Sequence, residues 1–164
     1  MIFVTVGTHE QQFNRLVAYM DQLVGDNTIT EDVMIQTGFS TYEPRYCKWS
    51  KLFPYSEMQK NMEDARIVIT HGGPSSFIAA LQIGKIPIVV PRRKEFDEHV
   101  NNHQVTFCKQ VADRYGNILV AESVDELGEF IRNYEKLVAG FPSEIKSNNL
   151  NFCNGLQELV KEIM

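Results

Sequence analysis

The sequence is poor in cysteine, and its cysteines follow no recognised pattern. Cys47, Cys108 and Cys153 are odd in number, lie far apart and include no Cys-x-x-Cys pair. A disulfide framework and a zinc site both need patterned cysteines, so neither is predicted. A reducing compartment, the cytosol, fits this usage best.

Basic residues are few, and long apolar runs are missing. Lys and Arg total 16 against 21 Asp and Glu, for a net charge of −5, and the two signs are interspersed. A general nucleic-acid-binding protein would show a clustered basic surface, so nucleic acid is not an expected partner. No apolar run approaches the length of a membrane span, and the first residues, MIFVTVG, lack the basic start and cleavage site of a signal peptide. If the protein acts at a membrane, another molecule must hold it there.

What the sequence does contain is an alternation of short β-rich runs and longer segments of helical period. With 164 residues, 43% of them hydrophobic, one packed domain is expected, and no repeat or Gly/Ser-rich linker divides it. The alternation is typical of a doubly wound α/β fold, in which helices cover both faces of a mainly parallel sheet. Strands are predicted near 1–6, 33–37, 46–49, 66–70, 86–90 and 117–121, and helices near 11–24, 55–63, 74–83, 99–113 and 124–138.

One break interrupts this pattern near the C-terminus, at AGFPSE, residues 139–144. Beyond it, apolar residues recur at helical spacing: Phe152, Leu156, Leu159, Val160 and Ile163. The chain is therefore divided into a domain over 1–140 and a C-terminal helix within 141–164. That helix either closes the core of the domain or docks on a partner protein.

The stretch ITHGGPSSF, residues 69–77, joins a buried strand to a helix. Gly72 and Gly73 let the backbone approach a ligand closely. Pro74 suits the first helical position, where its missing N–H costs nothing. This turn is therefore a candidate ligand site rather than a simple chain reversal.

Several donors of this turn are expected to point at one spot. They are the free N–H groups of Gly73, Ser75 and Ser76, together with the two serine hydroxyls. With the helix dipole, such donors favour an anion, most naturally a phosphate. His71 either belongs to this site or is a buried, hydrogen-bonded histidine at a strand end.

A second loop is expected beside this turn, because open parallel sheets bind ligands beyond the carboxyl ends of their strands. In VGTHEQQF, residues 6–13, Gly7 permits a tight exit from the first strand, and Thr8 and His9 precede a helix. The loop lacks the full dinucleotide fingerprint. A lone glycine does not by itself identify a nucleotide site.

The third loop is PRRKEFDEHVNNHQ, residues 91–104. Its bases and acids are balanced, which favours a solvated loop over a phosphate-binding or membrane-binding patch. The bases are Arg92, Arg93 and Lys94, and the acids are Glu95, Asp97 and Glu98. A dense polar set also stands at the start of the next helix, namely Asp97, His99, Asn101, His103 and Gln104. Helix capping alone does not explain this density.

Two other chemistries fit these residues less well. His99 and His103 are four apart on one predicted helical face near Asp97, as metal ligands are, but no HExxH motif accompanies them. A Ser-His-Asp triad would need a GxSxG nucleophile turn, which the sequence lacks. No metal and no cofactor are therefore predicted.

The motifs together resemble a known family. THGGPSSFIAALQIGKIPIVVPR followed by FDEHVNNHQ is similar to the donor-binding region of the two-domain, inverting glycosyltransferases that use nucleotide sugars, a group containing the lipid II-forming N-acetylglucosaminyltransferase. FVTVGTHEQQFNRLV, IQTGFSTYEP and the short length resemble one branch of that group. The branch contains the catalytic subunit of the dolichol-linked chitobiose-forming transferase and its bacterial capsule and exopolysaccharide counterparts. The resemblance covers about residues 1–121.

This resemblance implies half of an enzyme. The expected fold is that of the C-terminal, nucleotide-sugar-binding half of a GT-B glycosyltransferase, Rossmann-like and doubly wound. In this branch the other half is a separate, membrane-associated subunit that binds the lipid-linked saccharide acceptor. The implied activity is transfer of a hexose from a UDP-sugar, in the cytoplasm at the inner face of the membrane, and only together with that partner.

The resemblance also assigns site residues. His71, Gly72, Gly73, Ser75 and Ser76 match the phosphate-binding turn, and Gly7, Thr8 and His9 match the glycine loop near the phosphates and the sugar. Phe53 lies where the family lets a backbone segment read the uracil, and Asp97, Asn101, His103 and Gln104 match the polar segment near the transferred sugar. The helix N-terminus would stabilise the leaving diphosphate without a metal. The general base that accepts the proton of the acceptor hydroxyl is His9 or a group on the partner.

The chain departs from the family at one position. Many relatives carry a ribose-binding glutamate eight residues after the histidine, where this chain has Ala79, with Gln82 nearly one turn further on. The departure supports an alternative function, a non-catalytic subunit that enhances or stabilises a partner transferase. A UDP-sugar epimerase on the same fold would need two domains in one chain, and the length argues against it.

Overall fold

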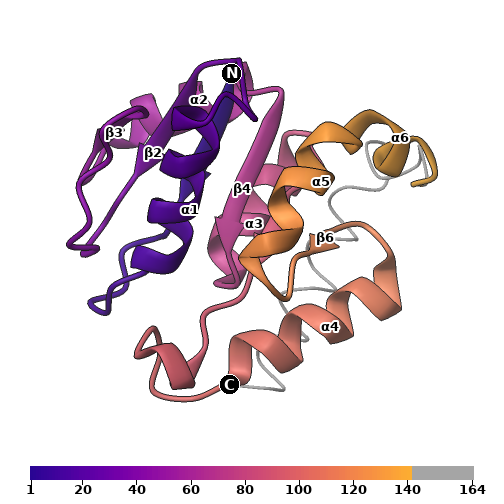
Figure 1. Cartoon of the computed structure of the whole chain (residues 1–164). Helices are drawn as coiled ribbons and strands as arrows, with labels where there is room; N and C mark the ends of the chain where they lie inside the picture. The colour runs from indigo at the N-terminus through magenta and orange to yellow at the C-terminus, as the bar shows by residue number, and fades with distance from the viewer. Residues whose placement is uncertain (142–164) are drawn as a thin grey trace.

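Six strands form one parallel sheet in the order β3-β2-β1-β4-β5-β6 within residues 1–141, which the computed structural model describes (Figure 1). The strands are β1 Ile2–Thr5, β2 Val33–Gln36, β3 Lys48–Ser50, β4 Ile67–His71, β5 Ile88–Val90 and β6 Leu119–Val120. The helices are α1 Asn14–Gly25, α2 Tyr55–Asp64, α3 Pro74–Gln82, α4 His103–Tyr115, α5 Leu127–Arg132 and α6 Tyr134–Ala139, with short 3-10 helices η1 Lys94–Phe96 and η2 Val124–Glu126. This is the strand order of the Rossmann fold, so the doubly wound prediction is confirmed.

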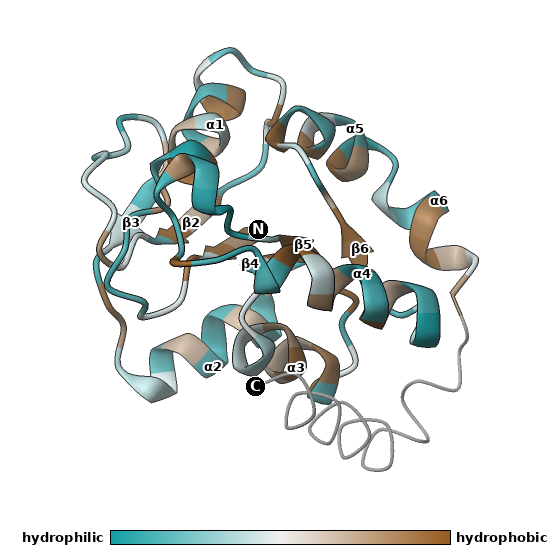
Figure 2. Ribbon diagram, turned by 90° about the horizontal axis from the view of Figure 1, so that it is seen from below, coloured by the Kyte–Doolittle hydropathy of each residue, from teal (hydrophilic) through white to brown (hydrophobic). Residues whose placement is uncertain are grey.

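Both faces of the sheet are buried, because successive strand residues point to opposite sides. Ile67 and Ile69 of β4 pack in the larger core, together with α1 and α5. Val68 faces the other side and packs with α2. Figure 2 shows α1 and α5 on one face of the sheet and α2 and α3 on the other. The near-continuous apolar strands that suggested a parallel sheet therefore reflect burial on two faces.

Some boundaries differ from those predicted. The helix predicted from residue 99 begins at His103, because the Asn101 side chain accepts a hydrogen bond from the His103 N–H (3.0 Å), an Asx turn that competes with helix. Asp97 lies in the left-handed region, with φ of 57°, and ends η1. The helix predicted over 124–138 is divided into η2, α5 and α6, and the last division falls at Asn133, whose ψ of 16° is not helical.

The segment before β3 is fixed by a buried carboxylate rather than by a neighbouring strand. Asp21 of α1, 1% exposed, accepts hydrogen bonds from the Tyr42 hydroxyl (2.9 Å) and from the N–H groups of Arg45 (3.0 Å), Tyr46 (2.8 Å) and Cys47 (3.1 Å). Because these N–H groups are taken, β3 begins at Lys48, two residues later than predicted. Burial alone would raise the pKa of Asp21, but the four hydrogen bonds outweigh it and hold the pKa below its usual value.

We therefore expect Asp21 to make stability depend on acid. Because its pKa is lowered by folding, its contribution to the free energy of unfolding is complete above the usual value of 3.8 and is lost as the pH falls through the folded value. Asp21→Asn should lower the free energy of unfolding at pH 7 by about 2 kcal/mol and flatten its fall below pH ~4. Urea denaturation at pH 7 and below pH ~4, with the exposed Asp32→Asn as control, measures these free energies. The same acid dependence in wild type and Asp21→Asn would contradict the prediction.

No helix within residues 1–141 is long and apolar enough to cross a bilayer. The predicted C-terminal helix and the boundary that sets it apart lie outside the described residues.

Candidate functional site

The three loops named from the sequence meet at the carboxyl ends of the neighbouring strands β1, β4 and β5. A Cβ atom at Gly7 would lie 2.3 Å from Nε2 of His71, so the first loop touches the second. The Gln104 amide oxygen accepts hydrogen bonds from the N–H groups of Gly72 (3.1 Å) and Arg92 (3.0 Å), which joins the second loop to the third. The structure thus brings together loops that are up to about 90 residues apart in sequence.

His71 organises the turn between β4 and α3. It is buried between Gly7 and Gly73, its Nδ1 accepts a hydrogen bond from the Gly73 N–H (3.1 Å), and its Nε2 lies 3.0 Å from the Ser76 hydroxyl. Since a backbone N–H can only donate, the ring proton is on Nε2 and donates to Ser76. Burial, with the nearby Arg92 cation, lowers the pKa of His71 to about 3, so the ring is neutral near pH 7.

The backbone donors of this turn are fewer than predicted, and the expectation of three free N–H groups is corrected. The Gly73 N–H donates to His71, and the Ser76 N–H donates to the Gly73 carbonyl (3.2 Å). Ser75, which is exposed, occupies the second helical position, where an N–H has no acceptor inside the helix. Because the Ser76 oxygen accepts from His71, its own proton is left to donate. The turn therefore offers the Ser75 N–H and both serine hydroxyls to an anion, as the sequence predicted for the hydroxyls.

Arg92 is a fully buried cation next to this turn. Its guanidinium donates to four main-chain carbonyls, those of Gln11 (2.9 Å), Gln12 (3.2 Å), Glu98 (3.0 Å) and Val6 (2.7 Å). No carboxylate within residues 1–141 lies in ion-pair contact with it, and the Glu98 carboxylate is held by Arg15 at 2.9 and 3.0 Å. Burial lowers the pKa of Arg92 to about 10, so it remains charged at neutral pH. A positive charge without a contacting counter-ion therefore lies close to the three loops, which favours an anion there.

Arg92 and Glu98 are the residues that sequence reasoning assigned wrongly. Both lie in a stretch interpreted as a solvated loop, yet both have 0% exposure. The available signal was position, since Arg92 directly follows the buried run PIVVP, residues 87–91. A residue there is still within the protein interior, whatever its charge.

His9 comes together with His99, which sequence reasoning did not place in the donor site. The two ring centroids are 4.8 Å apart and the planes are tilted by 32°. Nδ1 of His9 accepts from the Gln11 N–H (3.2 Å), and Nδ1 of His99 accepts from the Asn101 N–H (3.3 Å). Burial and the Arg92 charge lower the pKa of His9, and burial and the His9 charge lower that of His99. Both rings are therefore neutral near pH 7, with the proton on Nε2.

The other predicted site residues fall into two groups. Thr8, Asp97 and His103 are exposed and Asn101 is half-buried, so all four are accessible from solvent at this edge. Gln104 is buried, and its oxygen is occupied by two N–H groups, so it positions the loops. The Phe53 ring packs on Phe3, with centroids 6.2 Å apart, which leaves only its backbone for the predicted uracil contact.

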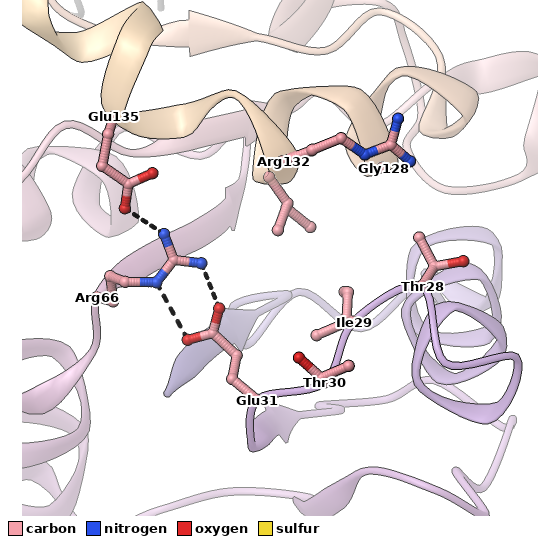
Figure 3. A pocket seen from close by; sticks show the side chains of 9 residues that line it. Thr28, Ile29, Thr30, Glu31, Arg66, Gly128, Arg132 and Glu135 are labelled. Atoms are coloured by element: carbon pink, nitrogen blue, oxygen red, sulfur yellow. Dashed lines mark hydrogen bonds and ion pairs between the residues drawn. The ribbon is translucent and has the colours of Figure 1, made fainter.

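Several cavities lie away from these residues. One of about 420 Å³ opens beside the third loop and is lined by Arg15, Arg93, Glu95, Phe96, Glu122, Ser123, Val124 and Asp125, none of which was predicted as a site residue. Another, of about 200 Å³, lies at the amino ends of the strands, and Figure 3 shows Arg66 in it between Glu31 and Glu135. Arg66 forms ion pairs with both carboxylates there. Its charge is thereby neutralised, which does not favour an anionic ligand.

No group of three or more His, Cys, Asp or Glu side chains is placed to hold a metal ion within the described part of the chain. The alternative of a metal on Asp97, His99 and His103 is therefore not supported. That the reaction uses no metal stays a prediction.

The family follows from comparison with known proteins. Residues 1–138 match the family model described as the glycosyltransferase family 28 C-terminal domain. The chain belongs to this family.

Solved structures similar to this glycosyltransferase family 28 domain support the same fold. They include the glycosyltransferase SnogD from Streptomyces nogalater, with a TM-score of 0.58 and 17% identity, and the calicheamicin glycosyltransferase CalG4, with a TM-score of 0.60 and 19% identity. Each alignment covers 96% of this chain but only 39% and 38% of the respective structures. The domain thus has the fold of one half of a GT-B glycosyltransferase, as predicted.

A curated relative is similar over a shorter stretch. The UDP-N-acetylglucosamine transferase subunit ALG13 of Yarrowia lipolytica is 35% identical over 77 residues, which are 46% of this chain and 37% of the relative. The family 28 domain therefore matches less than half the length of that relative.

Proposed function

We propose that this family 28 domain is the donor-binding catalytic subunit of a heteromeric, inverting glycosyltransferase. It would transfer a sugar, by our inference a hexose, from a UDP-sugar to a polyprenyl-diphosphate-linked saccharide in surface polysaccharide biosynthesis. The observation that carries the proposal is Arg92, a buried cation beside the turn at His71–Ser76 that no carboxylate of residues 1–141 contacts. Such a charge is costly in a protein interior unless an anion or an ordered set of dipoles balances it.

The chemistry needs little more than this charge arrangement. An acceptor hydroxyl attacks the anomeric carbon from the face opposite the diphosphate, the bond from that carbon to the diphosphate oxygen breaks, and the electron pair leaves with UDP. The Ser75 N–H, the Ser76 hydroxyl and the Arg92 charge would stabilise the negative charge that develops on the leaving oxygen. The proton of the acceptor passes to a general base, His9 or a group on the partner.

A second subunit is part of the proposal. The relative from Yarrowia lipolytica is itself named a subunit, which supports an assembly of two chains here. We infer that the partner is membrane-associated, binds the lipid-linked acceptor, and holds this chain at the cytoplasmic face of the membrane. The exposed Phe96 and Val100 on the third loop lie at the edge of the sheet where the second half of a GT-B enzyme would close over the donor.

Calorimetric titration of UDP into the purified chain, alone and with the protein encoded beside it, tests the proposal. We expect UDP to bind, more tightly with the partner, and ADP to bind at least tenfold more weakly, because only the uracil can be read by the backbone near Phe53. Transfer from radiolabelled UDP-sugars to a lipid-linked acceptor would then identify the donor. Absence of UDP binding in both states, with the partner shown to associate, would refute it.

One observation favours the second candidate function, an accessory subunit without catalysis. Ala79 stands where the resemblance places a ribose-binding glutamate, and a methyl group forms no hydrogen bond to a ribose hydroxyl. In that case the partner alone would transfer sugar, and this chain would raise its rate without binding UDP.

A further inference from the structure

Three histidines of the site share one local arrangement. In each, Nδ1 accepts a hydrogen bond from the N–H two residues later: Gln11 for His9 (3.2 Å), Gly73 for His71 (3.1 Å) and Asn101 for His99 (3.3 Å). Because the backbone group supplies the proton in each contact, all three neutral rings carry their own proton on Nε2. The loops have therefore selected one tautomer three times, in segments that are far apart in sequence.

The three rings differ in what their Nε2 protons contact. That of His71 is used internally, on the Ser76 hydroxyl. For His9 and His99, by contrast, no hydrogen bond from Nε2 is found within residues 1–141, and both rings are partly exposed. The side chain that acts on the His99 ring as an acceptor is that of Asn101. The two rings lie tilted against each other with centroids 4.8 Å apart, so two N–H donors from different loops come together in one place.

We propose that His99, which no motif assigned to the donor site, acts with His9 as a pair of neutral N–H donors that bind the diphosphate of the donor nucleotide. This inference rests on the proposed function, because it takes a nucleoside diphosphate as the ligand. Both imidazoles would then contact the leaving group, the diphosphate. The proton of the acceptor hydroxyl then goes to a base on the partner, because a ring whose Nδ1 lone pair is engaged and whose Nε2 is protonated has no free lone pair to accept it.

The surrounding charges keep this pair neutral. The titratable groups that act on His9 are Arg92 and Glu10, and those that act on His99 are His9, Arg92 and His103. Arg92 is a permanent cation, so a second positive charge on either ring is disfavoured, and burial adds to this effect. A neutral imidazole that donates to an oxyanion is an established catalytic device, as with the electrophilic histidine of triosephosphate isomerase.

Nucleotide affinity tests the role of His99 in the 164-residue chain with its partner. We expect His99→Ala to weaken UDP binding about tenfold and to leave the binding of uridine, which has no diphosphate, within twofold of wild type. His99→Gln retains an N–H donor and should keep most of the UDP affinity. Gln110→Ala, at an exposed position of α4 outside the three loops, is the control and should bind UDP as wild type does.

Two outcomes separate this inference from the proposed function. If wild type binds UDP and His99→Ala binds it equally well, the role of His99 is refuted while the proposed function stands. If wild type binds no UDP, with or without the partner, both are refuted.

The tautomer is measured without any nucleotide. Imidazole nitrogen chemical shifts of the free protein at pH 7 should show Nε2–H for His9 and His99, both neutral. A proton on Nδ1 of either ring would overturn the donor pair even where UDP binds.

Discussion

Gly73→Ala is expected to destroy the turn that we propose binds the nucleotide, while leaving the sheet intact. A Cβ atom at this position would lie 2.1 Å from Cε1 and 2.8 Å from Nε2 of His71. Retreat of the ring toward the first loop is limited, because it already lies so close to Gly7 that a Cβ there would come within 2.3 Å of Nε2. We therefore expect His71 to leave its place and release both Gly73 and Ser76, with UDP affinity reduced more than tenfold and the free energy of unfolding lowered by about 2 kcal/mol.

The effect is steric and not a matter of backbone strain, since Gly73 has an ordinary φ of −70° and ψ of 126° that alanine adopts freely. Gly128→Ala is the matched control, because a Cβ there would meet Leu23 at 3.8 Å, an ordinary contact, and alanine raises helix propensity. Combining Gly73→Ala with His71→Ala removes the clash, so the stability losses of the two changes should not add. Calorimetry and urea denaturation measure both effects; wild-type UDP affinity in Gly73→Ala would show that the turn does not bind the nucleotide.

The fold was predictable because its signals are local and repeated. The strand predicted near residues 66–70 is β4 at Ile67–His71, and Pro74 begins α3 as its fixed φ predicts. When such strands alternate with helices, the apolar faces of both are buried by a parallel sheet covered with helices on both faces. The meeting of three loops at one edge then follows from strand direction alone.

The electrostatics of the site were not predictable in the same way. RRKEFDE, residues 92–98, looks like a run of compensating surface charges. Yet Arg92 points inward and donates to main-chain carbonyls of the first loop, and Glu98 pairs with Arg15. These contacts join segments about 80 residues apart, and no periodicity encodes them. The pairing of His9 with His99 also joins distant segments and was not predictable either. Each tautomer, by contrast, is fixed locally, because Nδ1 accepts a hydrogen bond from the N–H two residues later.

The largest loss of stability is expected from Arg92→Ala. The substitution removes the guanidinium, whose four hydrogen bonds go to the carbonyls of Val6, Gln11, Gln12 and Glu98. Those buried carbonyl oxygens then lose that donor. It also leaves a cavity beside Phe13, whose ring lies 5.0 Å from the guanidinium. We expect the free energy of unfolding to fall by more than about 3 kcal/mol in urea denaturation.

The neighbouring Arg93 provides the control, because it is partly exposed and its guanidinium bonds, among residues 1–141, only to Glu95 and the Glu122 carbonyl. Arg93→Ala should therefore cost less than about 1 kcal/mol. Equal stability of the two alanine variants would contradict the structural role of Arg92. Arg92→Lys then separates charge from geometry, since an ammonium keeps the cation but cannot span four carbonyls. If UDP binding needs only the charge, a folded Arg92→Lys protein retains most of its UDP affinity. If the guanidinium instead holds the first and third loops in place, UDP affinity falls together with stability. In that case His9 and His99 lose the alignment that makes them a pair.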